Sequence, residues 1–189
     1  MKLILASQSP RRRELLTLAG FTFTVLPANI DETRRAGEAP DAYVQRLALE
    51  KARAIAKLHP EATVLGADTT VVLDGEALEK PLDLNDARRM LLALSNRAHE
   101  VHTGIAVVSP TETHTHIETT RVVFSAIHQA ELETYVASGD PLDKAGAYGI
   151  QGYASRWIPR IEGDYFNVVG LPVAATVKLL TRTSLLEFE

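Results

Sequence analysis

Three consecutive arginines, Arg11 to Arg13, follow Ser9 and Pro10 at the expected start of the first helix. Ser9 offers an N-cap hydroxyl, and Pro10 suits the first helical position. A helix N-terminus carries partial positive charge, so each cation there costs about 0.3–1 kcal/mol. An anion bound at this turn would remove the conflict, because helix amides and guanidinium groups both bind phosphate. A basic turn balanced by solvent and nearby acids is the other interpretation of these residues.

A lysine interrupts the apolar face of the helix expected over residues 41–58. Lys51 lies four residues after Leu47 and four residues before Ile55, so the three share one face. A core-facing ammonium group is costly unless it is paired or faces a polar cleft. The other interpretation is a lysine whose stem packs while its head reaches water. The apolar stripe comprises Tyr43, Val44, Leu47, Ala48, Ala54, Ile55 and Leu58.

A carboxylate lies within a run of β-branched and apolar residues over 64–73. Aspartate is depleted in strands, and a carboxylate among apolar neighbours needs a cation, a metal or a reaction to justify its cost. The other interpretation places Asp68 at a strand end, where it caps a turn beside Gly66. The strand pattern continues for five residues past Asp68, which favours a functional carboxylate.

An Asp-Gly pair at the end of this strand is a strong hairpin-turn signal. A strict two-residue turn would pair Lys80 with Thr69. It would also place Glu79 on the face of Asp68. A bulge at the glycine would exchange the two faces, and the sequence leaves both registers open. In either register the hairpin brings an acid and a base near Asp68.

A glycine-rich segment over residues 144–152 contains Gln151. Its three glycines, at a spacing of three, permit a ligand to approach the backbone closely. The segment lacks the lysine pattern of a phosphate-binding loop, so by itself it is a weak signal.

The histidines do not predict a metal site. His99 and His102 are three residues apart in an expected strand, so they face opposite ways. His114 and His116 share a face, but we expect no acidic ligand beside them. A tight site needs three or four ligands.

The bulk composition indicates one globular domain over residues 1–189. The chain has 46% hydrophobic residues and contains no apolar run long enough to span a membrane. Its first apolar stretch is too short for a signal peptide. The absence of cysteine fits a reducing cytoplasm. A formal net charge of −4 argues against a nucleic-acid partner, so basic residues that bind an anion must act locally.

Strand-like and helical segments alternate without repeats or linkers, which predicts an α/β fold with a mixed sheet. We expect helices over residues 10–19, 41–58, 83–94, 130–137 and from Gly170-Leu171-Pro172 to about 181, and strands over 3–6, 21–26, 64–73, 77–78, 98–108 and 117–127.

Four motifs in this order resemble the Maf family of nucleoside triphosphate pyrophosphatases. They are SQSPRRR, GADTTVV with the following EKP, DPLDKAGAYGIQG and VVGLP. The similarity extends from Leu3 to about Leu180. Within the family, Ala67-Asp68-Thr69 and Gly149-Ile150-Gln151-Gly152 resemble the branch that acts on dTTP and UTP.

The resemblance implies hydrolysis of a nucleoside triphosphate to a monophosphate and pyrophosphate, with a divalent cation, Mg²⁺ or Mn²⁺. It implies the two-lobed fold of inosine triphosphatases, with a long twisted mixed sheet, flanking helices and an active-site cleft. It also suggests a homodimer. By family position Asp68 is the proton acceptor, and Arg11, Thr69 and Gln151 match the specificity positions.

The remaining site residues follow from the same resemblance. Ser7, Arg12, Glu32, Lys51 and Lys80 fall where the family lines its phosphate and metal site. Glu32 and Asp68 would supply oxygen ligands of the kind that Mg²⁺ or Mn²⁺ accepts. Arg12, Lys51 and Lys80 would offset charge on the phosphates and the departing pyrophosphate.

Two rival functions stay open at this point. The first is the same chemistry on purine triphosphates. The second is a nucleotide-binding regulator of cell division, or of septum formation, with incidental turnover. The expected function is clearance of dTTP, UTP or modified pyrimidine nucleotides from the cytoplasmic pool.

Overall fold

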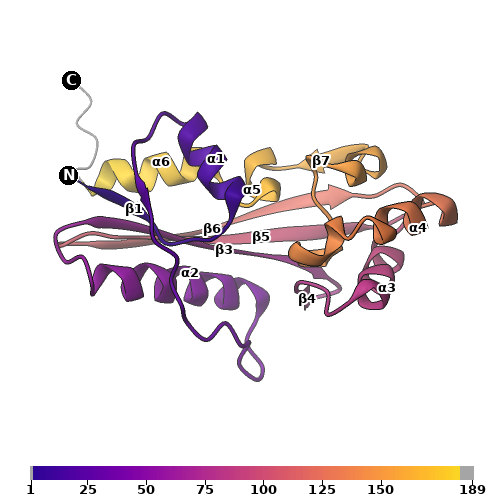
Figure 1. Cartoon of the computed structure of the whole chain (residues 1–189), viewed down its shortest axis with the longest axis horizontal. Helices are drawn as coiled ribbons and strands as arrows, with labels where there is room; N and C mark the ends of the chain where they lie inside the picture. The colour runs from indigo at the N-terminus through magenta and orange to yellow at the C-terminus, as the bar shows by residue number, and fades with distance from the viewer. Residues whose placement is uncertain (1, 184–189) are drawn as a thin grey trace. The chain divides into compact units, whose positions relative to one another are not determined.

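The computed structural model describes residues 2–183 of the chain (Figure 1). The elements are β1 (Leu3–Leu5), α1 (Pro10–Leu18), β2 (Thr24–Val25), α2 (Pro40–Ala56), β3 (Thr63–Leu73), β4 (Glu76–Leu78), α3 (Leu84–Leu94), β5 (Ala98–Val108), β6 (Thr113–Val123), α4 (Gln129–Ala137), the short 3₁₀ helices η1 (Asp140–Asp143), η2 (Ala145–Ala147) and η3 (Tyr153–Trp157), β7 (Arg160–Glu162), α5 (Tyr165–Val169) and α6 (Val173–Arg182). The predicted ends of the domain, residues 1 and 184–189, lie outside the described residues.

The strands form one mixed seven-stranded sheet in the order β2-β1-β3-β5-β6-β7, with β4 paired to β3. Strand β1 is parallel to both β2 and β3. Strand β4 is antiparallel to β3, and β7 is antiparallel to β6. Parallel and antiparallel pairs therefore coexist, which confirms the predicted α/β class with a mixed sheet.

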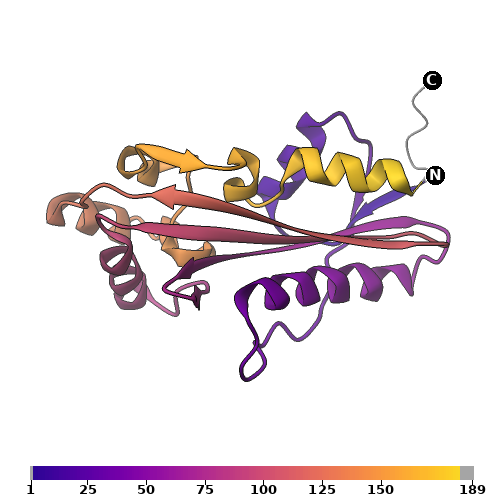
Figure 2. The ribbon, with the colours of Figure 1, turned by 180° about the vertical axis from the view of Figure 1, so that it is seen from behind.

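Contacts within the chain define two compact units, and β3, β5 and β6 contribute residues to both. The first unit comprises residues 2–68, 103–118 and 170–183 of the described chain. In this unit α2 covers one face of the strands, and α1 and α6 lie on the opposite face, as Figure 1 and Figure 2 show from two sides. The second unit comprises residues 69–102 and 119–169.

Two glycines let α2 lie unusually close to the strands of the first unit. A Cβ atom at Gly66 of β3 would overlap the carbonyl oxygen of Ala48 and lie 2.9 Å from the backbone nitrogen of Ala52. A Cβ atom at Gly104 of β5 would lie 2.5 Å from the carbonyl oxygen of Val44. Any side chain at these positions would push the helix outward, so the glycines set its distance from the sheet.

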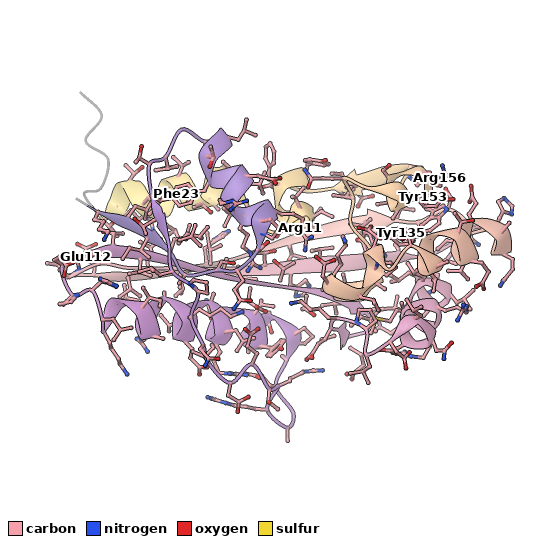
Figure 3. All side chains as sticks on the ribbon, viewed as in Figure 1. Arg11, Phe23, Glu112, Tyr135, Tyr153 and Arg156 are labelled. Atoms are coloured by element: carbon pink, nitrogen blue, oxygen red, sulfur yellow. The ribbon has the colours of Figure 1, made fainter. Side chains whose placement is uncertain are left out.

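The second unit is built around aromatic side chains. Tyr135 of α4 stacks on Tyr153 with ring centroids 5.5 Å apart. The guanidinium carbon of Arg156 lies 3.9 Å from the centroid of the Tyr153 ring, and the three side chains are labelled in Figure 3. Trp157, which is 2% exposed, donates from Nε1 to Glu131 at 2.9 Å. The indole is thus buried with its one polar atom paired.

Most predicted elements are confirmed, with some differences in their bounds. Strand β6 begins at Thr113 rather than 117, because a tight turn over residues 109–112 returns the chain at once. Strand β2 is shorter than the expected 21–26. Strand β7, helix α5 and the 3₁₀ helices were not predicted, because they are too short to show a periodic pattern. None of the helices among residues 2–183 is long and apolar enough to cross a membrane.

Candidate active site

Lys51 lies between two carboxylates in the first unit. Its Nζ atom is 2.7 Å from Oδ1 of Asp68 and 2.9 Å from Oε2 of Glu32. The side chains of Lys51 and Asp68 are 9% and 13% exposed, whereas that of Glu32 is 52% exposed. The buried lysine is therefore paired, and the interpretation in which its head escapes to water is wrong. One carboxylate of the trio remains open to solvent.

Close packing between α2 and β3 brings the ion pair together. Gly66 lies two residues before Asp68, on the same face of the strand, and contacts the backbone of Ala48 and Ala52. Lys51 belongs to the same turn of α2, so its side chain reaches the carboxylate directly. This role of Gly66 was not predicted. The sequence feature that could have indicated it is the pair of small residues, Ala48 and Ala52, on either side of Lys51, because small residues allow a helix to pack closely.

The buried face of α2 differs slightly from the predicted stripe. Ala52 is fully buried, whereas Ala54 is only partly buried. Leu58 is 71% exposed because α2 ends at Ala56, so Leu58 lies beyond the helix and does not follow its periodicity. The other predicted positions of the stripe, Tyr43, Val44, Leu47, Ala48 and Ile55, are buried.

The side chain of Arg12 is buried and hydrogen-bonded to main-chain carbonyl groups. Its Nε donates to the oxygen of Gly170 at 2.8 Å, and its Nη1 donates to the oxygen of Ala67 at 2.8 Å. The Nη1 atom is also 3.3 Å from Oγ of Ser7, which accepts from the backbone N–H of Ser9 at 3.2 Å. One guanidinium thus connects α1, the strand that carries Asp68 and the segment before α6.

Burial lowers the pKa of Arg12, while the charges of Asp68 and Glu32 act in the opposite direction. A guanidinium group stays protonated in proteins, so the site holds a buried cation beside these two acids. The carbonyl contacts change the interpretation of the arginine cluster. Arg12 does not require a bound anion to justify its position, because its charge is already met by carbonyl dipoles and two carboxylates.

The helix start itself agrees with the sequence analysis. Ser9 is the N-cap of α1, and its side chain accepts from the backbone N–H of Arg12. Arg11 is partly buried on the first turn, where Figure 3 labels it, and Arg13 is exposed. Gly20 follows the C-cap residue Ala19 with a φ of 83°, the left-handed conformation that glycine commonly adopts after the end of a helix.

The β3–β4 hairpin of the second unit has the strict two-residue turn. Leu73 is opposite Glu76, and Val71 is opposite Leu78, so the bulged register is excluded. Pairing stops at Leu78, and Lys80 follows as an exposed residue without ladder hydrogen bonds of its own. Thr69, which directly follows Asp68 on β3, is partly buried.

The glycine-rich segment is held at several points within the second unit. The backbone N–H of Gly146 donates to the oxygen of Glu79, next to Lys80, at 3.1 Å. The ammonium group of Lys144 binds the side chains of Asp140 and Asp143 at 2.9 and 2.7 Å. These contacts hold the part of the segment that precedes Gln151 and join it to the residue next to Lys80. The side chain of Gln151 itself is exposed.

The histidines are paired in ways that the sequence did not indicate. His114 lies 2.6 Å from Glu112, and His116 lies 3.0 Å from Glu118, so the expectation of no acidic neighbour was wrong. Each acid is two residues from its histidine along the chain: Glu118 lies on the same face of β6 as His116, and Glu112 lies in the turn just before the strand. Among residues 2–183, no three His, Cys, Asp or Glu side chains converge as a metal-binding group. Glu32 and Asp68 meet at one ammonium group and form a two-carboxylate set.

The predicted site residues thus fall into two groups. The first unit brings together Ser7, Arg12, Glu32, Lys51 and Asp68, and it also contains Arg11. Thr69, Lys80 and Gln151 belong to the second unit. A carboxylate held by an ammonium group, beside a solvent-exposed acid and a buried guanidinium, can polarise water and bind an anionic phosphate chain.

Comparison with known proteins identifies the family. The Maf-like protein family profile matches residues 2–183. A dTTP/UTP pyrophosphatase of Koribacter versatilis is 52% identical over 186 residues, covering 98% of this chain and 96% of that protein. A dTTP/UTP pyrophosphatase of Myxococcus xanthus is 53% identical over 183 residues, covering 97% and 93%. A HAM1 protein from Coxiella burnetii has the same fold, with a TM-score of 0.55, 17% identity and coverage of 96% and 99%. With a profile match across the described residues and relatives about half identical over nearly their whole length, this chain belongs to the Maf family.

Proposed function

We propose that this protein is a nucleoside triphosphate pyrophosphatase that hydrolyses dTTP and UTP to the nucleoside monophosphate and pyrophosphate. Relatives named dTTP/UTP pyrophosphatase, 52% and 53% identical over nearly the whole chain, support this assignment. The structural observation that carries it is the Lys51–Asp68 ion pair with Glu32 on the same ammonium group. The physiological role is removal of unwanted pyrimidine nucleotides from the cytoplasmic pool.

In this proposal Asp68 is the general base. It orients a water molecule and takes its proton as the water attacks the phosphorus, and pyrophosphate departs from the nucleoside monophosphate. Lys51, Lys80 and Arg12 neutralise charge on the phosphate oxygens, and Ser7 lies hydrogen-bonded to Arg12. No covalent intermediate is required, so positioning and charge neutralisation supply the catalysis.

The acid pair fits a divalent cation. Mg²⁺ is usually bound by one or two carboxylates together with substrate phosphates and water, rather than by a cage of protein ligands. Glu32 and Asp68, both within 2.9 Å of one ammonium group, are a pair of this kind. Mg²⁺ or Mn²⁺ held there would supply charge neutralisation and a more acidic bound water.

Arg11, Thr69 and Gln151 are the proposed specificity residues, and the uracil or thymine base is the group that they distinguish. The side-chain carbonyl of Gln151 can accept from the N3–H of these bases, and its amino group can donate to a base carbonyl.

A homodimer is a further part of the proposal. Light scattering of the purified protein tests it.

A screen of nucleoside triphosphates tests the function. The protein is incubated with Mg²⁺ or Mn²⁺ and with dTTP, UTP, CTP, GTP or ITP, and pyrophosphate and phosphate release are measured over many turnovers. We expect pyrophosphate from dTTP and UTP, with Asp68→Asn as the inactive control. Phosphate as the product, or a preference for ITP, would contradict the proposal. Binding without repeated turnover would support the regulatory protein instead.

A further inference from the structure

Glu32 lies in a long irregular segment. Residues 26–39 connect β2 to α2 without a helix or strand, yet Oε2 of Glu32 is placed 2.9 Å from Nζ of Lys51. A segment of this length has many conformations available to it, and its ordering is costly in entropy. Specific contacts must therefore hold the carboxylate beside Lys51 and Asp68.

A partly buried ion pair fastens the end of this segment to α2. Nε of Arg46 lies 2.6 Å from Oε1 of Glu38, and Nη2 of Arg46 lies 2.8 Å from Oε2. These side chains are 13% and 10% exposed. The hydrogen bonds from Arg46 lower the pKa of Glu38 to about 2, so the carboxylate stays charged at neutral pH. The carbonyl oxygen of Glu38 accepts two further hydrogen bonds from Arg34.

The same helix also holds the backbone at Glu32 itself. The hydroxyl of Tyr43 donates to the carbonyl oxygen of Glu32 at 3.0 Å. Nη2 of Arg46 donates to the carbonyl oxygen of Thr33 at 3.2 Å. Two successive carbonyl groups, at and directly after Glu32, are thus bound by α2. Tyr43 and Lys51 are eight residues apart, so they share one face of that helix.

We propose that Tyr43 and Arg46 are positioning residues that hold Glu32 beside Lys51 and Asp68, with Glu38 fixing the orientation of Arg46. The helix that carries the ammonium group then also places the acid opposite it. Misplacement of a reacting group by about 1 Å can cost about 10²-fold in rate. This inference rests on the proposed function, because it assumes that Glu32 acts in the hydrolysis.

A double-mutant cycle tests the inference. Tyr43→Phe and Arg46→Met are made in the native protein and in the Glu32→Gln protein, and kcat/KM for UTP is measured. In the native background we expect a loss of roughly 3–10-fold for Tyr43→Phe and roughly 10–100-fold for Arg46→Met. In the Glu32→Gln background each substitution should cost less than about twofold, because the group that it positions is gone.

The second unit offers a matched control. Arg88 binds Glu133 through Nε at 2.9 Å and Nη2 at 2.6 Å, the same two-point geometry as the Arg46–Glu38 pair. Arg88→Met should leave kcat/KM within about twofold of the native value. Melting temperatures are recorded for every variant, so that loss of folded protein is separated from loss of positioning.

Three outcomes would overturn the inference. One is an equal loss in both backgrounds, which would mean that Tyr43 and Arg46 act independently of Glu32. Another is full activity of both Tyr43→Phe and Glu38→Gln. These two variants keep the test decisive if Arg46→Met fails to fold. The third is a Glu32→Gln variant that hydrolyses UTP as fast as an active native protein does. A native protein that releases no pyrophosphate would contradict the proposed function itself, so the two failures are distinguishable.

Discussion

Asp68 and Lys51 form an ion pair with 2.7 Å between Oδ1 and Nζ, although Lys51 lies on a helix and Asp68 in the middle of a strand. Both side chains are largely buried, and Glu32 approaches the same ammonium group from an irregular segment. Removing one partner of a buried pair commonly costs 3–5 kcal/mol, because a charge is left uncompensated. The solvent-exposed Glu32 reduces that cost here, and it leaves the trio accessible to a ligand.

We expect Asp68→Asn to fold and to bind UTP but to lose turnover by roughly 10²–10⁴-fold. The amide keeps an acceptor for Lys51 but cannot take a proton from water. Pyrophosphate release gives kcat, and circular dichroism with nucleotide titration checks folding and binding. A near-normal kcat in the folded variant would remove Asp68 from the role of general base.

Arg12→Ala should destabilise the protein without nucleotide. Removal of a cation from the helix N-terminus should stabilise the protein by about 0.3–1 kcal/mol. Loss of the guanidinium leaves the carbonyl groups of Ala67 and Gly170 without these donors, at about 1–3 kcal/mol each. The second effect is larger, which reverses the expectation from helix polarity alone that the variant would be as stable as the native protein or slightly more so.

Urea unfolding without nucleotide measures this difference. Arg13→Ala is the matched control, because Arg13 is the exposed neighbour on the same turn and its loss should change stability little or raise it slightly. If Arg12→Ala is as stable as Arg13→Ala, the carbonyl contacts do not stabilise the fold.

Gly66→Ala should destabilise the protein by more than about 2 kcal/mol and lower its activity. The added methyl group would meet backbone atoms of Ala48 and Ala52, which cannot move without displacing α2 and Lys51. The comparison is Gly152→Ala, whose Cβ would have no neighbour nearer than 3.7 Å. Thermal unfolding of both variants decides the point, and equal stability would argue against close helix packing at Gly66.

Gln151→Glu should reduce kcat/KM for UTP and dTTP much more than for CTP. The new carboxylate can accept from N3–H of uracil, but it opposes the neighbouring base carbonyl, and opposed polar groups are costly. Kinetics with the three nucleotides measure the preference. An equal loss for all three would mean that Gln151 does not read the base.

His99 should make the stability of the protein fall between about pH 6.5 and pH 4. Burial lowers the pKa of His99 from 6.5 to about 4, so the unfolded chain binds a proton in this range and the folded protein does not. Stability therefore decreases as the pH falls, by up to about 3 kcal/mol in all. The imidazole Nε2 lies 2.7 Å from the hydroxyl of Tyr148, a contact that an amide can replace.

Urea unfolding of the native protein and of His99→Gln at pH 7, 6 and 5 measures this dependence. The variant should show a flatter slope over this range. Carboxylates with lowered pKa values, such as Glu38, lose their stabilisation only below about pH 4.5, outside the range compared. Parallel slopes would mean that His99 is not held neutral in the folded protein.

The sequence by itself determined the features that depend on neighbouring residues. Ser9 and Pro10 start α1, and the Asp-Gly pair makes the two-residue turn after β3, because caps and tight turns are set by local backbone and side-chain geometry. The ordered motifs also identified the family and the candidate residues. A carboxylate in a strand and a lysine on an apolar helix face were recognisable as costly in isolation.

Only the tertiary structure decided which partners compensate these buried charges. Lys51 pairs with Asp68 because Gly66 admits α2, and Arg12 binds two carbonyl groups from segments 55 and 158 residues away. The anchoring of Glu32 by Tyr43 and Arg46 was equally absent from the sequence analysis. Such contacts depend on strand register and on the distance between packed elements. These quantities result from the packing of the chain as a whole, so no local pattern specifies them.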